Sequence, residues 1–220
     1  MSKLIPELMN YKHICNLLKN KQTILYPTDT IWGIGCDATN VDAVKKIYDI
    51  KQREESKALI CLVSCFEMLL SYVEDIPEQV HEILKEASKP TTIIYNYPRN
   101  FASNLIAGDQ TIAIRLVNKG FVHELIKTFG KPIVSTSANV SGNSSPKDFK
   151  EIDERILKGV DYVVNLPDFK SNSVPSRIIK ILEDNTVHNS RPYHNKAPYI
   201  DISPKHRERS VYEIESEVEN

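Results

Sequence analysis

Short runs of apolar, β-branched residues alternate along this chain with segments that have helical character. The runs TTIIY at 91–95 and TIAIRL at 111–116 are typical of strands, and residues 119–129 favour a helix. This alternation narrows the possible folds more than any other property, because interleaved helices and strands pack as a layered α/β structure. The sequence therefore predicts an α/β fold with a mixed sheet.

The remaining elements follow from the same criteria. Asn40 is a favourable N-cap residue for a helix that carries apolar residues on one side. Pro77 suits the first turn of a helix that reaches Ser88. A strand edge and a turn are expected within 28–39. Further strands are expected at 23–26, 58–63, 132–134, 161–165 and 177–182, and further helices at 7–20 and 148–158.

The chain of 220 residues shows no internal repeat and no linker before residue 192. We therefore expect one domain over residues 1–192. Residues 193–220 are polar and highly charged and include KHRER at 205–209. Such a composition favours a solvated or partly disordered tail over an RNA-binding arm.

The formal net charge is −1, so the chain has no overall positive field that would attract nucleic acid. An anion site must therefore be built from locally clustered cations. The four cysteines show no C-x-x-C spacing, and no run of 18 apolar residues occurs. We expect a cytoplasmic protein without a membrane segment. The six histidines are scattered, which gives no support to a transition-metal site.

Three cations, Lys51, Arg53 and Lys57, lie within seven residues between a predicted helix and a predicted strand. Ligands dock at such junctions in α/β folds, and these side chains could hold a triphosphate. The alternative is a solvated charged loop that Glu54 and Glu55 neutralise. Charge runs are usually solvated surfaces, so this segment alone favours the alternative.

A polar run, STSANVSGNSSP, follows the buried strand candidate at 132–134 directly. Its small side chains allow a ligand to approach the backbone, and its hydroxyl and amide groups can donate to phosphate or carboxylate oxygens. A turn rich in its usual residues explains the run equally well. The candidates here are Ser135, Ser137, Asn139 and Ser145.

Two arginines lie in apolar or β surroundings, Arg115 inside TIAIRL and Arg191 after the last expected strand. A buried arginine must be paired or face a cavity, so a structural ion pair and an anion ligand are both open. Thr30 lies near Trp32, where a hydroxyl would sit beside an apolar wall. A strand bend with a core tryptophan is the simpler interpretation.

The chain contains neither G-x-x-x-x-G-K-[ST] nor G-x-G-x-x-G, and it has only seven glycines. If ATP binds, side chains must therefore do most of the work that backbone amides do in a P-loop. No nucleophile elbow is present, so covalent catalysis has no candidate.

Taken in order, several segments resemble the YrdC-like family of threonylcarbamoyl-AMP synthases. They are YPTDTIWGIGCDA (26–38), KQR (51–53), TTIIY (91–95), IAIR (112–115) and PIVSTSANVSG (132–142) followed by SSP. The resemblance covers about residues 5–192, and the run from strand to Ser-x-Asn is its most specific part. It implies a twisted open mixed sheet with helices around a large concave cavity, in the short, single-domain form of the family.

The resemblance also implies a reaction. Threonine and bicarbonate give a carbamate, which attacks the α-phosphate of ATP and releases pyrophosphate. Mg²⁺ would bind through the ATP phosphates without a protein metal cage. Other proteins of the tRNA threonylcarbamoyl-transfer pathway would then modify an adenosine beside the anticodon, and tRNA itself is a further candidate partner.

The motifs carry the family's site residues over to this chain. Lys51 and Arg53 would be catalytic. The ATP-binding residues would be Lys51, Arg53, Lys57, Thr92, Ser137, Asn139, Ser145 and Arg191. The threonine-binding residues would be Thr30, Arg115, Ser135 and Ser176.

Three positions depart from the family's pattern. Glu54 stands where relatives often have proline, Leu62 where longer relatives have a threonine-binding histidine, and Arg177 in place of a small Ser or Thr. Two other functions are weighed against the synthase: a non-catalytic module of the same fold that binds tRNA or double-stranded RNA, and a paralogue with another acyl or carbamoyl substrate. The net charge and the hydroxyl-rich loop argue against the RNA module.

Overall fold

The computed structural model describes residues 11–55, 57–164, 166, 176–181 and 187–191. Its helices are α1 (Tyr11–Lys19), α2 (Val41–Lys51), α3 (Phe66–Tyr72), α4 (Glu78–Glu86), α5 (Gly120–Phe129) and α6 (Glu154–Gly159), with 3-10 turns η1 (Ser103–Leu105) and η2 (Phe149–Glu151). Its strands are β1 (Ile24–Pro27), β2 (Trp32–Gly35), β3 (Ile60–Val63), β4 (Thr91–Asn96), β5 (Thr111–Leu116), β6 (Ile133–Ser137), β7 (Tyr162–Val163), β8 (Arg177–Ile181) and β9 (Val187–Arg191).

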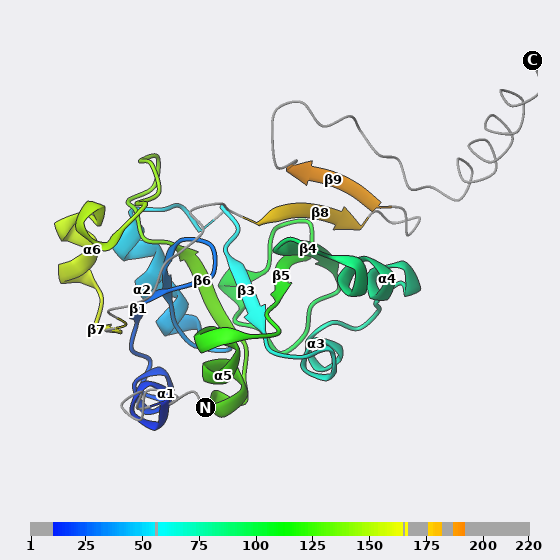
Figure 1. Cartoon of the computed structure of the whole chain (residues 1–220), viewed down its shortest axis with the longest axis horizontal. Coiled ribbons are helices and arrows are strands. Elements are labelled where there is room, and N and C mark those ends of the chain that lie inside the picture. The colour runs from blue at the N-terminus through cyan, green and yellow to red at the C-terminus, as the bar shows by residue number, and fades with distance from the viewer. Residues whose placement is uncertain (1–10, 56, 165, 167–175, 182–186, 192–220) are drawn as a thin grey trace, which may run out of the picture.

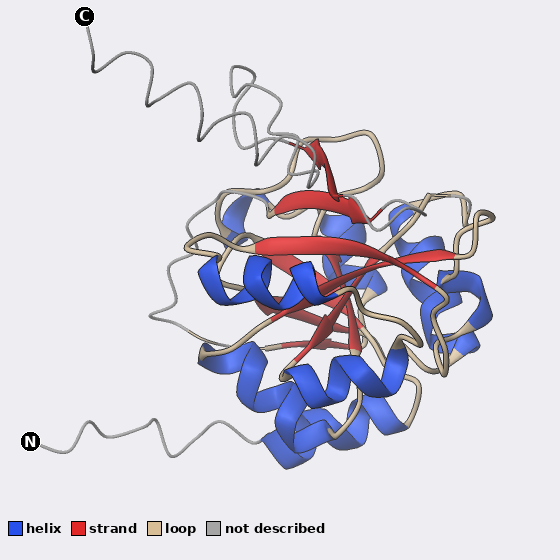
Figure 2. Cartoon of the chain, turned by 90° about the vertical axis from the view of Figure 1, so that its right-hand side faces the viewer, coloured by secondary structure: helices blue, strands red, loops and turns tan. Residues whose placement is uncertain are grey.

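The strands form one mixed sheet in the order β7-β1-β2-β6-β3-β5-β4-β8-β9, and helices lie on both sides of it (Figures 1 and 2). The predicted α/β fold with a mixed sheet is confirmed. Strands β3 and β5 run parallel, whereas β4 and β6 pair with this couple in the antiparallel direction. Among the described residues, no helix is long and apolar enough to cross a membrane.

The two faces of the sheet bury different helices. On one face, Leu25, Cys61 and Ile114 belong to a core that also contains residues of α2, α3, α4 and α6. On the other face, Tyr26 and Leu62 belong to a smaller core with residues of α1 and α5. The split follows from the alternation of side chains along each strand. Helices α1 and α5 cover this second face at β1 and β3. We call the part of it that carries Arg115, Thr92, Ser135 and Ser137 the open face.

The structure corrects three expectations. The helix predicted at 148–158 is divided into η2 and α6, because the Asp153 side chain accepts a hydrogen bond from the Arg155 backbone amide and starts a new helix. Helix α3 was not predicted. Its N-cap is Cys65, whose Sγ accepts from the Met68 amide, and cysteine is not among the usual N-cap residues.

The third correction concerns the last strand. The final strand was expected at 177–182, with Arg191 beyond it. Instead β9 follows, pairs antiparallel with β8 and contains Arg191, which lies opposite Ile178. Its sequence, VHNSR, is mostly polar, as suits a strand at the edge of a sheet. The predicted tail at 193–220 and residues 7–10 of the first predicted helix lie outside the described residues.

Gly35 tests the packing between β2 and its neighbours. A Cβ atom there would lie 2.8 Å from the Tyr26 ring and would also strike the Val134 carbonyl oxygen. We expect Gly35→Ala to lower the free energy of unfolding by about 1–3 kcal/mol, as overpacking does. Gly108→Ala is the matched control, because nothing lies within 4 Å of its added Cβ. Urea denaturation measures both, and equal stability of the two variants would contradict the packing.

Candidate functional site

Polar side chains line the open face of the sheet in adjacent strands. Arg115 on β5 lies directly opposite Leu62 on β3 and Thr92 on β4. Directly opposed residues share a face. On β6, Ser135 pairs with Ile60, two residues before Leu62, and so points to the same side. The register therefore gathers Arg115, Thr92 and Ser135 on one face.

Ser137 joins this face from the end of β6. It lies opposite Gly33 of β2 and two residues after Ser135, so both serines point to the open face. Gly33 leaves room there, because an added Cβ would lie 3.3 Å from the Ser135 hydroxyl. A larger residue at position 33 would therefore press against the Ser135 hydroxyl.

The loop between β1 and β2 is organised by Thr28. Its hydroxyl accepts from the backbone amides of Thr30, at 3.1 Å, and Ile31, at 3.2 Å, and it donates to the Ile31 carbonyl at 2.7 Å. The Thr30 hydroxyl lies 2.9 Å from that of Thr28, and either hydroxyl can donate in this contact. The loop is therefore held by its own side chains.

Arg115 reaches this loop from the middle of β5. Its Nη2 donates to the Asp29 carboxylate, and its Nη1 lies 3.5 Å from the Thr30 hydroxyl. The arginine side chain is 8% exposed, whereas that of Asp29 is 47% exposed. Among the described residues, the buried Nε of Arg115 has no hydrogen-bond partner. The arginine is thus ion-paired, and its buried Nε is an unused hydrogen-bond donor.

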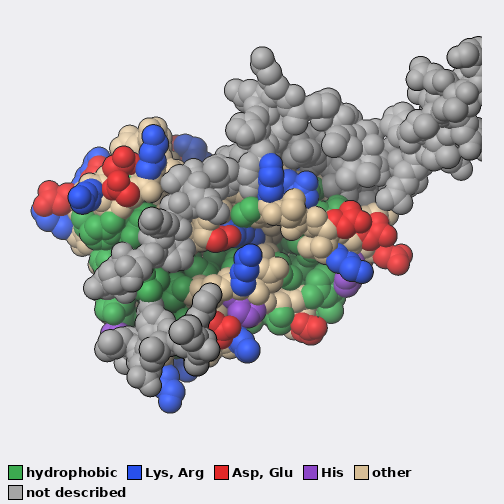
Figure 3. All heavy atoms as spheres, viewed as in Figure 1, with side chains coloured by type: hydrophobic (Ala, Val, Ile, Leu, Met, Phe, Trp, Pro, Cys, Tyr) green, Lys and Arg blue, Asp and Glu red, His purple; other side chains and the backbone are tan. Residues whose placement is uncertain are grey.

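Asp29 is the residue that the sequence interpretation missed. It stands between the two threonines of YPTDT, but no pattern indicated that a side chain 86 positions away would contact it. Acidic and basic side chains do meet in the middle of the molecular face drawn in Figure 3.

Lys51 connects α2 to the polar loop that follows β6. It is almost fully buried, and its ammonium donates to the Ser137 carbonyl and, at 2.7 Å, to that of Asn139. The Ser141 amide in turn donates to the Lys51 carbonyl at 2.8 Å. Burial, and secondarily the charge of Arg53, lowers the pKa of Lys51 to about 8. Two motifs that lie far apart in the sequence therefore form one unit.

The other two cations of the KQR segment fold back on their own loop. Arg53 donates from Nε to the Lys57 carbonyl, at 3.1 Å, and from Nη2 to that of Ala58, at 3.0 Å. The Lys57 ammonium lies 3.6 Å from the Glu54 carboxylate, and both side chains are exposed. Lys57 therefore matches the alternative of a solvated, neutralised loop in this structure.

Thr92 of β4 and Ser176, which precedes β8, contact each other on the side of Arg115 that faces away from β3. Their hydroxyls are hydrogen-bonded at 2.7 Å and buried. Arg177, the departure from the family's pattern, donates from Nε to the Thr91 hydroxyl at 2.9 Å. Because neighbouring side chains of a strand alternate, Thr91 faces away from Thr92. The arginine therefore lies beside the face opposite to that of Ser176 and Arg115.

The three remaining predicted residues lie in the loop after β6 and in β9. The Asn139 amide nitrogen donates to the Val140 and Asn143 carbonyls, at 3.0 and 2.7 Å, and its buried Oδ1 has no partner among the described residues. Ser145 is exposed. The Arg191 backbone lies in β9, and its side chain lies outside the described part of the structure. The described residues contain no group of three or more His, Cys, Asp or Glu placed to hold a metal ion.

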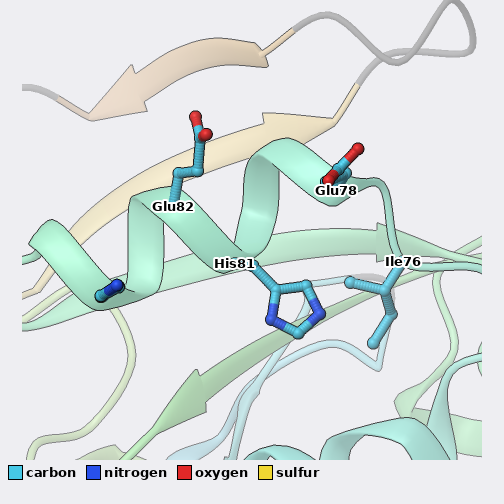
Figure 4. Close-up of a pocket in the computed structure, with 5 residues that line it drawn as sticks. Ile76, Glu78, His81 and Glu82 are labelled. Carbon is cyan, nitrogen blue, oxygen red and sulfur yellow. The ribbon is translucent and has the colours of Figure 1, made fainter.

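A pocket on helix α4 lies apart from these residues. It is lined by Ile76, Glu78, His81, Glu82 and Lys85 (Figure 4). Its histidine ring packs on Phe66 with centroids 3.9 Å apart. None of the predicted site residues lines this pocket. The large concave cavity expected from the resemblance stays a prediction.

The structure shares its fold with solved proteins. It superposes on E. coli YciO with a TM-score of 0.71 at 22% identity, over 82% of this chain and 87% of that one. It also superposes on P. abyssi Sua5 complexed with L-threonine, with a TM-score of 0.71 at 24% identity, over 77% of this chain. This chain spans only 50% of that Sua5 chain. These likenesses establish the fold.

Sequence relatives are more informative. The threonylcarbamoyl-AMP synthase of Vibrio parahaemolyticus is 34% identical over 152 residues, which cover 67% of this chain and 81% of that protein. The protein of the same name from Pseudoalteromonas translucida is 35% identical over 164 residues, or 73% of this chain and 87% of that one. The model of the Sua5/YciO/YrdC family, described as telomere recombination, matches residues 16–192. The chain therefore belongs to the Sua5/YciO/YrdC family.

Proposed function

We propose that the chain is an L-threonylcarbamoyladenylate synthase, a nucleotidyltransferase that makes threonylcarbamoyl-AMP and pyrophosphate from L-threonine, bicarbonate and ATP. Relatives that bear this name align with this chain over most of their own length. The observation that carries the proposal is Arg115. A buried arginine with an unpartnered Nε, facing a row of hydroxyls, suits the carboxylate of a small polar substrate.

The amino acid occupies the open face between the β1–β2 loop and β4. Arg115 binds its carboxylate, because a guanidinium matches that group with two parallel hydrogen bonds. The hydroxyls of Thr30, Ser135 and Ser176 border the same region and offer partners to the remaining polar groups of threonine. Leu62 lies directly opposite Arg115 and gives an apolar contact where longer relatives have a histidine.

ATP binds next to this region, where Lys51 meets the loop after β6. An ammonium has three N–H donors, and two of those of Lys51 hold the Ser137 and Asn139 carbonyls. The third is left for a phosphate oxygen. Arg53 and Lys57 turn from their loop toward the triphosphate when it binds. Thr92, Ser137, Asn139, Ser145 and Arg191 complete the proposed nucleotide site.

The reaction needs positioning and charge neutralisation more than a protein base. The carbamate formed from threonine and bicarbonate attacks the α-phosphate in line, and pyrophosphate leaves. Arg115 fixes the amino acid, and the cations of the KQR segment stabilise the charge that develops on the phosphates. Mg²⁺ bound with ATP would supply further charge neutralisation. The hydroxyls of Ser135 and Ser137 are the protein groups that would lie near such an ion, which keeps several waters and needs few protein ligands.

The product then serves tRNA modification. In this proposal the enzyme is cytoplasmic, and other proteins of the threonylcarbamoyl-transfer pathway pass the group to an adenosine beside the tRNA anticodon. A non-catalytic RNA-binding module is not favoured, because the sequence relatives are named as synthases and the polar residues of the open face suit a small ligand.

Pyrophosphate release tests the reaction directly. Release should require ATP, L-threonine and bicarbonate together, and mass spectrometry should detect threonylcarbamoyl-adenylate in the mixture. Release that continues at the same rate without threonine would refute the proposed reaction. Adenylate formation with another amine in place of threonine would identify the paralogue with a different substrate.

Arg115→Lys tests the carboxylate contact. Lysine keeps the charge but loses the planar fork. We expect the threonine concentration for half-maximal pyrophosphate release to rise at least about tenfold, with the ATP requirement little changed, because a buried charged contact is worth more than about 1.4 kcal/mol. Arg155→Lys is the matched control, since that arginine is also paired with an aspartate but is exposed. An unchanged threonine requirement in Arg115→Lys would remove Arg115 from this role.

Lys51 gives the protein a defined pH dependence. Its pKa is about 8 in the folded state against 10.5 ordinarily, so between these values the unfolded chain binds more protons. The stability of the wild type relative to Lys51→Met should therefore be flat below pH 8 and rise with pH above it. The rise amounts to a few kcal/mol at most, since one pKa unit corresponds to about 1.4 kcal/mol.

Urea denaturation of both proteins at about pH 7, 8.5 and 10 measures this difference. A difference in stability that does not change with pH would show that the Lys51 ammonium is not buried under the loop. In that case, the Ser137 and Asn139 carbonyls would need a hydrogen-bond donor other than the Lys51 ammonium.

A further inference from the structure

Asp29 is the solvent-facing member of the ion pair on the open face. The Arg115 side chain is almost completely buried, whereas nearly half of the Asp29 side chain is exposed. A carboxylate has room for about four hydrogen bonds, and the contact with Arg115 Nη2 uses only part of this capacity. Asp29 therefore offers a negative charge to a ligand that lies against Arg115.

The backbone that follows this carboxylate is held by hydrogen bonds within the protein. The Thr28 hydroxyl bonds both amides that follow Asp29 and also the Ile31 carbonyl. Thr28 and Thr30 are themselves buried. A residue on a backbone held in this way is suited to a binding role, because little backbone freedom is lost when its side chain contacts a ligand.

The pair of charges complements an α-amino acid. Such a molecule carries its carboxylate and its amine on the same carbon atom, so a carboxylate bound by Arg115 places the amine within a few bonds of the guanidinium. Asp29 already lies at hydrogen-bond distance from that guanidinium. A site for phosphate alone would gain nothing from it, because a carboxylate repels an anion.

We propose that Asp29 binds the α-amine of the amino-acid substrate while Arg115 binds its carboxylate. The inference rests on the proposed function and adds a residue that determines substrate specificity. Asp29 thereby favours ligands that carry an amine beside the carboxylate over ligands that lack the amine.

In a competing interpretation, Asp29 has a role only in the ligand-free protein. In that case it neutralises Arg115 until the substrate carboxylate displaces it, and removing its charge would strengthen the binding of every carboxylate. The two interpretations predict opposite effects of Asp29→Asn, which keeps the shape of the side chain and removes its charge.

Isothermal titration calorimetry of two ligands distinguishes them. L-Threonine carries the amine, and its 2-hydroxy analogue, 2,3-dihydroxybutanoate, has a hydroxyl in its place. We expect Asp29→Asn to weaken threonine binding at least about tenfold and to change binding of the analogue by less than about threefold, because only the charged contact is lost. Asp29→Glu should retain most of the preference for threonine.

Asp153→Asn is the matched control, since this aspartate is also paired with an arginine but on helix α6. It should leave both affinities unchanged. Thermal unfolding of each variant confirms that it is folded. If Asp29→Asn does not fold, the comparison of Asp29→Glu with the wild type decides: loss of the preference in the charged variant overturns the proposal, and its retention supports it.

The remaining outcomes also decide. Equal weakening of both ligands, or tighter binding of both, would overturn the role of Asp29 and leave the proposed function intact. A wild-type protein that binds no threonine would overturn the proposed function first, and the role of Asp29 with it.

Discussion

A buried guanidinium in the middle of a sheet is the constraint around which this molecule is arranged. Arg115 lies on β5 with strands on both sides and is only slightly exposed. Burying a charge costs several kcal/mol unless partners compensate. The β1–β2 loop supplies those partners through Asp29 and Thr30, and Thr28 keeps the loop in place. Hairpin, strand and site are therefore one electrostatic unit.

Lys51 is a second buried cation whose charge is compensated by a loop, at the other end of the site. Its ammonium is buried beneath the loop after β6 and is compensated by two carbonyls. The carbonyls carry no full charge, so burial lowers the pKa of Lys51, whereas Arg115 has a carboxylate partner. The protein thus places two buried cations, each held by its own loop, under a face lined with hydroxyls. With a net charge of −1, its affinity for anions must come from this local arrangement.

Much of the fold, and part of the candidate site, could be predicted from the sequence. The interleaved helices and strands gave the α/β sheet, and the polar run after 132–134 marked the loop that Lys51 binds. The order of the motifs gave the family. These features are local, so they can be read from residue types and spacing.

What could not be predicted depends on contacts between distant segments. Asp29 and Arg115 are 86 positions apart, and Lys51 and Ser137 are equally distant. No spacing rule connects them, because the sheet order brings together strands that are not consecutive. The sequence marks Arg177 as a departure from the family's pattern but not its direction, and the alternation along β4 and its bond to Thr91 place it toward the other face. Strand β9 was missed because an edge strand need not be apolar.

A crystal structure with L-threonine and a non-hydrolysable ATP analogue tests the central claim most directly. The expected result is a threonine whose carboxylate contacts the Arg115 guanidinium on the open face, with the triphosphate beside Lys51 and the loop after β6. Threonine bound elsewhere, for example in the α4 pocket around His81, with Arg115 still paired only within the protein, would contradict the assignment of this face as the amino-acid site.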